Sequence, residues 1–175
     1  KNLVNYYTKL GYYDTGIFAT DILTRVLFEN GDSQLAADLI LSDSVHSFAE
    51  MKRLGATTFW EYWPQSLRDR SHNHPMFGAV AAYLYDYLLG IRAKNGSAAY
   101  SEIIISPVIA DGINCIEGHR TFKTGKVCVS YKKTETSVEF EISIPENQRA
   151  EFVFEGETHT LAAGLNKLTF EKQQN

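Results

Sequence analysis

The sequence predicts an α+β protein in which a helical part is followed by a small antiparallel β-sandwich. Up to about Ile91, apolar residues recur at helical spacing, whereas after residues 94–97 (KNGS) they occur in short and often alternating runs. The 175 residues, of which 44% are hydrophobic, are enough to bury a substantial core. We therefore expect a helical domain over residues 1–95 and a β-sandwich over residues 96–175.

Four helices are expected in the first part. Apolar periodicity, together with start and stop residues such as Asn30-Gly31 and Asp32-Ser33, places them at about residues 17–30, 32–40, 47–54 and 77–88. Gly55 ends the third helix and Gly90 the fourth. Helices joined by short turns are typical of stacked helical hairpins.

Five strands are expected in the second part, over residues 103–105, 126–131, 137–144, 151–154 and 168–170. Turn-forming pairs that contain glycine separate them, at Asp111-Gly112, Thr124-Gly125 and Glu155-Gly156. Strands this short and this closely spaced predict an antiparallel sandwich.

Composition and charge disfavour several classes of partner. The chain has 17 Lys and Arg against 21 Asp and Glu, a net charge of −4, and no long basic run, so we expect no nucleic-acid partner. No apolar stretch is long enough for a membrane span. The two cysteines, Cys115 and Cys128, can pair only if adjacent strands bring them together, and two alone leave the compartment undecided.

The chemistry is expected in the connection between the third and fourth helices. Residues 55–63, GATTFWEYW, set the carboxylate of Glu61 among four aromatic rings on a segment that favours extended backbone. A buried carboxylate in apolar surroundings needs hydrogen bonds, a positive neighbour or a task. Aromatic rings beside a carboxylate and imidazoles are typical of carbohydrate sites. The alternative is that Trp60 and Trp63 are ordinary core residues.

His72 and His74 stand two residues apart before the fourth helix, with Asn73 between them. Metal ligands on a helix are usually three or four residues apart, and no cysteine or further clustered histidine completes a tetrahedral set. We therefore expect no metal and no other cofactor. The simpler alternative is that Ser71 or Asn73 caps the helix.

The segment GATTFWEYW and residues 71–91, SHNHPMFGAVAAYLYDYLLGI, together resemble the carboxy-terminal part of bacterial α-L-rhamnosidases of glycoside hydrolase family 78. The resemblance covers essentially the whole chain, since residues 15–40 are similar to late barrel helices and residues 103–133 to the terminal sandwich. It implies that residues 1–95 are the last helices of an (α/α)6 barrel of six hairpins, and that a β-sandwich follows.

The resemblance also implies an activity and its residues. Members of the family release terminal non-reducing α-L-rhamnose with inversion, which uses one carboxylic acid on the leaving oxygen and a separate carboxylate that activates water. The general base lies in the TT-x-WE motif, which Glu61 matches. A histidine that contacts rhamnose is matched by His74, with Asn73 beside it. Trp60 and Trp63 are expected to wall the sugar pocket.

The sequence departs from the family at Tyr62, where many members have a basic residue, and in a shorter linker between the two motifs. The family's general acid lies upstream, and we interpret Asp14 and Asp69 as turn residues, Asp14 alternatively as a cap. No partner acid is therefore found. The sequence also begins with Lys1 and not with a methionine. We expect these residues to be one part of a longer enzyme, inactive without the missing upstream segment.

Two other functions stay open. One is a different glycosidase or a polysaccharide lyase on a similar barrel. The other is a non-catalytic fragment that binds carbohydrate without turnover. In this second case the β part or the residual pocket would bind the sugar. Otherwise we expect the β part to be structural and to carry no chemistry.

Overall fold

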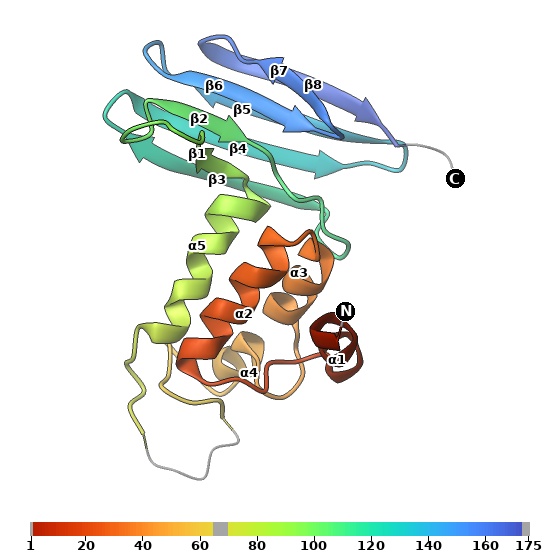
Figure 1. Cartoon of the computed structure of the whole chain (residues 1–175), viewed down its shortest axis with the longest axis vertical. Helices are drawn as coiled ribbons and strands as arrows, with labels where there is room; N and C mark the ends of the chain where they lie inside the picture. The colour runs from red at the N-terminus through yellow and green to blue at the C-terminus, as the bar shows by residue number, and fades with distance from the viewer. Residues whose placement is uncertain (1, 65–69, 173–175) are drawn as a thin grey trace. The chain divides into compact units, whose positions relative to one another are not determined.

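The computed structural model describes residues 2–64 and 70–172, and it divides into two units, Lys1–Tyr83 and Leu84–Asn175. The first unit is helical and the second contains all the strands of the described residues (Figure 1). The predicted order, a helical part followed by a β part, is confirmed. Within the described residues, no helix has both the length and the apolar character needed to cross a membrane.

The helical unit consists of α1 (Asn2–Leu10), α2 (Ile17–Glu29), α3 (Ser33–Leu41), α4 (Phe48–Arg53), the 3₁₀ turn η1 (Met76–Val80) and the short α5 (Ala81–Tyr83). α2 packs against α3 and η1, and α3 also contacts α1 and α4. The predicted helices that became α2, α3 and α4 are confirmed, whereas α1 was not predicted. Of its nine residues only Tyr7 is buried.

The ends of these helices follow from local hydrogen bonding. The hydroxyl of Ser47 accepts a hydrogen bond from the N–H of Glu50 at 3.0 Å, which caps the start of α4. At the end of α2, the N–H of Asn30 donates to the carbonyl oxygen of Val26 at 3.1 Å. The core of the unit is largely aromatic and aliphatic, and includes Tyr13, Leu27, Leu39, Trp63 and Phe77.

The fourth predicted helix is present but is not a regular α-helix. η1 and α5 occupy its first part, and the π-helical turn η2 (Leu84–Leu88) follows in the second unit. The N–H of Leu89 donates to the carbonyl oxygen of Leu84 at 2.8 Å, which is the wider bonding of a π turn.

The β unit contains two four-stranded sheets, drawn as two layers in Figure 1. The first has the order β1 (Ile91–Ala93), β2 (Glu102–Ile105), β6 (Arg149–Phe154), β7 (Glu157–Thr160). The second has the order β3 (Cys115–Phe122), β4 (Gly125–Lys133), β5 (Ser137–Ile144), β8 (Gly164–Glu171). Apolar residues of both sheets share one buried core, among them Ile91, Ile105, Val129, Phe140 and Phe152.

One expectation for this unit needs correction, and one open question is answered. The sandwich is not wholly antiparallel, because β2 pairs in parallel with β6 after the chain has passed through β3, β4 and β5 of the other sheet. Cys115 and Cys128 lie on the adjacent strands β3 and β4, yet both are free. Cys128 is opposite His119 in the ladder, four residues along β3 from Cys115.

Candidate functional site

The segment with the candidate carboxylate begins where α4 ends. Gly55 has a φ of +92°, a left-handed conformation that glycine adopts without steric cost. The N–H of Gly55 donates to the carbonyl oxygen of Lys52, and the N–H of Ala56 to that of Met51, each at 3.0 Å. These bonds satisfy carbonyls at the end of α4 and turn the chain into the next segment.

The two stretches that the sequence singled out, residues 58–61 and 71–74, lie side by side. Two backbone hydrogen bonds join them, one from Glu61 N–H to Ser71 O at 2.9 Å and one from His74 N–H to Phe59 O at 2.8 Å. We call these stretches the paired segments. Because they are bonded to each other, the positions of the two motifs are linked.

Glu61 has a separate partner for each carboxylate oxygen. The backbone N–H of Ser71 donates to Oε2 at 3.2 Å, and Nη1 of Arg70 lies 3.8 Å from Oε1. The Glu61 side chain is 22% exposed, so solvent still reaches it. These are the hydrogen bond and the positive neighbour that its aromatic surroundings require. Sequence analysis did not identify Arg70, because nine residues separate it from Glu61 and no helical or strand spacing relates the two.

Tyr62 lies against the same arginine. The guanidinium carbon of Arg70 is 4.6 Å from the centre of the Tyr62 ring, within the range of a cation–π contact. Arg70 therefore bridges two consecutive residues, Glu61 by charge and Tyr62 by stacking.

Trp60 is half-buried, and the imidazole of His72 is stacked on its indole, with ring centroids 4.1 Å apart. This stack adds a side-chain contact to the paired segments. It covers one face of the indole.

Trp63 lies in the core of the helical unit and is 7% exposed. Its indole stacks nearly parallel to the ring of Tyr13 and lies 4.2 Å, between centroids, from the ring of Phe77. The indole N–H donates to the carbonyl oxygen of Thr15 at 2.7 Å. These are the contacts of a core residue, which was the alternative interpretation for Trp63.

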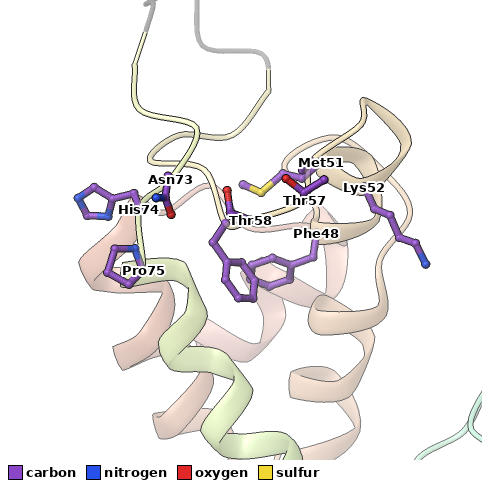
Figure 2. Close-up of a pocket in the computed structure, with 10 residues that line it drawn as sticks. Phe48, Met51, Lys52, Thr57, Thr58, Asn73, His74 and Pro75 are labelled. Carbon is purple, nitrogen blue, oxygen red and sulfur yellow. The ribbon is translucent and has the colours of Figure 1, made fainter.

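The candidate residues other than Trp60, which lines neither, border two separate pockets in the described part of the chain. Glu61, Tyr62 and Trp63 border a pocket of about 400 Å³ together with residues 16–19, at the start of α2. Asn73 and His74 border another, of about 500 Å³, whose wall also includes Phe48, Met51, Thr57 and Thr58 (Figure 2). The structure thus brings Glu61 together with Trp63, and Asn73 together with His74.

The imidazole of His74 points away from Met51 and Lys52 (Figure 2). Its Nδ1 accepts a long hydrogen bond, 3.4 Å, from the N–H of Met76 at the start of η1. In the neutral ring this leaves Nε2–H as a donor for a ligand. The prediction that Ser71 or Asn73 caps this helix is wrong, because Pro75 is the N-cap residue of η1 and no side chain caps it. The Ser71 hydroxyl bonds the backbone of Asn73 instead.

None of the described residues that line the Glu61 pocket is a second carboxylate. Asp69 lies outside the described residues. Asp14 is neither a simple turn residue nor a cap, because its carboxylate accepts hydrogen bonds from the hydroxyls of Tyr6 and Tyr7 at 2.5 and 2.6 Å. The described residues likewise contain no group of three His, Cys, Asp or Glu side chains that could hold a metal ion.

The sequence matches two family models. Residues 1–88 match the model of the bacterial α-L-rhamnosidase six-hairpin glycosidase domain, and residues 90–168 match that of the bacterial α-L-rhamnosidase C-terminal domain. An α-L-rhamnosidase of Alteromonas sp. (strain LOR) is 29% identical over 149 residues, which cover 79% of this chain and 16% of that protein. The chain spans about a sixth of the length of the curated relatives it matches.

Solved structures give the same result. A structure of an α-L-rhamnosidase from Dictyoglumus thermophilum superposes with a TM-score of 0.80 at 28% identity, covering 92% of this chain and 21% of that one. The Streptomyces avermitilis α-L-rhamnosidase complexed with L-rhamnose gives a TM-score of 0.82 at 21% identity, covering 93% and 18%, a likeness of fold.

Proposed function

Because the chain belongs to the bacterial α-L-rhamnosidase family, we propose that it is part of a glycoside hydrolase that releases terminal non-reducing α-L-rhamnose, with inversion, from glycosides or polysaccharides. In this proposal residues 1–95 are the last helices of the (α/α)6 catalytic barrel, and residues 96–175 form the terminal β-sandwich. The Streptomyces avermitilis relative was crystallised with L-rhamnose, which supports this class of sugar.

Glu61 is the general base of the proposed reaction. The observation that supports this role is the pair of contacts on its carboxylate, one from the Ser71 N–H and one from Arg70, on a side chain that solvent still reaches. These contacts hold the carboxylate in place, and its remaining lone pairs can accept a proton from water. The general acid comes from another part of the full-length protein, across a gap of roughly 6.5–9.5 Å that the water occupies.

The sugar is bound by His74 and Asn73 through their polar atoms and by Trp60 and Trp63 through their rings. Nε2–H of His74 is the donor that its contact with Met76 leaves available. Trp60 offers the indole face that His72 does not cover, and Trp63 offers only the edge that lines the Glu61 pocket.

The test is Glu61→Gln in the full-length protein, with an aryl α-L-rhamnoside as substrate. The amide keeps the shape of the side chain but is not a base, so kcat should fall by about 10²–10⁴-fold. Glu29→Gln, at an exposed position at the end of α2, is the control and should leave kcat unchanged. A Glu61→Gln enzyme that stays within tenfold of the original contradicts the assignment.

Proton NMR of the first product tests the stereochemistry. Inversion predicts that β-L-rhamnose appears first and mutarotates later, whereas α-L-rhamnose as the first product contradicts it. A panel of aryl glycosides of other sugars tests the alternative that the barrel has another specificity. Rhamnoside binding without any turnover by the original protein would indicate a carbohydrate-binding function instead.

A further inference from the structure

We propose that Arg70 is a positioning residue for Glu61, and that Tyr62 in turn holds Arg70 in place. This inference rests on the proposed function, because it assigns a role in preparing the general base. Arg70 does not act on the sugar in this proposal. It acts through the carboxylate of Glu61.

The geometry gives each oxygen of Glu61 a different kind of partner. Oε2 accepts from the backbone N–H of Ser71, which the paired segments fix in place, and Oε1 faces the guanidinium of Arg70 at 3.8 Å. Arg70 and Ser71 are consecutive, as are Glu61 and Tyr62. One pair of consecutive residues therefore contacts another pair. The carboxylate plane is therefore constrained from both sides.

Tyr62 restricts the position of the Arg70 guanidinium, which the ion pair alone does not. An arginine whose side chain is 36% exposed and whose Nη1 lies 3.8 Å from the carboxylate would by itself form a weak and mobile ion pair. Stacking over the Tyr62 ring at 4.6 Å restricts the guanidinium plane, which arginine does better than lysine because its charge is spread over a flat group.

The consequence for the base is geometric. Restriction of the carboxylate from both sides keeps a lone pair directed to one water position. Loss of Arg70 should therefore lower kcat more than it raises KM, whereas a purely structural role of Arg70 would lower stability without this difference between kcat and KM.

The experiment compares four variants of the full-length protein: Arg70→Ala, Arg70→Lys, Tyr62→Phe and Tyr62→Leu. The readouts are kcat and KM for an aryl α-L-rhamnoside, at low and at high salt. For Arg70→Ala we expect kcat to fall by about 2–5-fold with KM nearly unchanged, and the fall to be smaller at high salt because salt screens the ion pair. Arg70→Lys and Tyr62→Leu should lower kcat part of the way, because each removes the stacking but keeps the charge. Tyr62→Phe keeps the ring and should match the original.

Double variants separate this inference from the proposed function. If Glu61→Gln lowers kcat strongly and Arg70→Ala then has no further effect in that background, the two residues act as one unit, as we expect. An unchanged kcat in Arg70→Ala, with kcat still strongly lowered in Glu61→Gln, overturns the positioning role alone. A Glu61→Gln enzyme that retains activity overturns the proposed function and this inference with it. Thermal unfolding of each variant identifies a loss of activity that comes from misfolding.

Discussion

The indole of Trp60 and the imidazole of His72 are stacked with their planes 10° from parallel and their centroids 4.1 Å apart. The residues come from opposite members of the paired segments, twelve positions apart in the sequence. The stack therefore joins the carboxylate motif to the histidine motif through side chains, in addition to the backbone hydrogen bonds.

Removal of this stack should be visible in fluorescence and in substrate binding. His72→Ala uncovers Trp60, and we expect stronger tryptophan emission because an imidazole in contact quenches an indole. We also expect KM for an aryl rhamnoside to rise by roughly 2–10-fold. An aromatic pair of this kind contributes about 0.5–1.5 kcal/mol, which here stabilises one orientation of the Trp60 ring.

The control is the same substitution in a Trp60→Phe background. The only other tryptophan is Trp63, so emission should not change there. If emission rises equally in both backgrounds, His72 is affecting Trp63, and the stack is not the cause.

Trp63 is expected to contribute more to stability than to sugar binding. Trp63→Ala removes a ring packed between Tyr13 and Phe77 and should cost about 3–5 kcal/mol of unfolding free energy. Trp63→Phe retains much of the packing but loses the hydrogen bond to Thr15, and should cost about 1–2 kcal/mol. Urea denaturation followed by circular dichroism measures both. A large rise in KM for Trp63→Phe at unchanged stability would contradict the expectation.

The sequence was most informative where structure is determined locally. The stop at Asn30-Gly31 and the cap at Ser47 mark real helix ends, because a few neighbouring backbone groups decide them. The strand β3 was missed, because its residues alternate between half-buried and exposed and include Glu117, Gly118 and His119, which do not read as a strand.

Pairing between strands that are far apart in the sequence was harder to predict. The parallel contact of β2 with β6 depends on a crossover of more than forty residues, for which sequence periodicity gives no evidence. At the candidate site, the motif around Glu61 could be identified from its residues. Its partner Arg70 could not, because Glu61 and Arg70 share no helix or strand, and a contact of this kind depends on the folded backbone.

Asp14 gives a prediction for the acid side of the stability profile. Desolvation raises the pKa of this carboxyl. The hydrogen bonds from Tyr6 and Tyr7 together lower the pKa by more than desolvation raises it, so the net pKa is below the ordinary 3.8. A carboxyl with a depressed pKa in the folded state stabilises the fold above its unfolded pKa, and this stabilisation is lost as pH falls through the folded value.

We therefore expect Asp14→Asn to be less stable than the original at pH 6, and the difference to shrink below pH 4. Because the carboxylate is largely exposed, the effect should stay under about 1 kcal/mol. Urea denaturation at pH 6 and pH 3 measures it. The double variant Tyr6→Phe/Tyr7→Phe removes both donors, and Asp14→Asn should then change the pH dependence little. A difference between original and Asp14→Asn that is constant with pH excludes the ionised carboxylate as its source.

Two glycines of the β unit with similar backbone angles should respond very differently to alanine. Gly90 has a φ of +75° and Gly96 a φ of +81°, so alanine is strained at both and should cost about 1 kcal/mol for that reason alone. At Gly96 an added Cβ meets no described atom within 4 Å. At Gly90 it would lie 2.3 Å from the backbone nitrogen of Pro107 and the carbonyl carbon of Ser106.

Backbone cannot yield as a flexible side chain can, and the Gly90 carbonyl also accepts the N–H of Ser106 at 2.9 Å. Gly90→Ala must therefore separate the chain after η2 from the loop after β2, and we expect it to cost more than about 3 kcal/mol. Differential scanning calorimetry should show a small decrease in Tm for Gly96→Ala. For Gly90→Ala it should show a large decrease, or the variant should fail to accumulate as soluble protein. Equal melting temperatures for the two variants would show that the close approach at Gly90 is not a structural constraint.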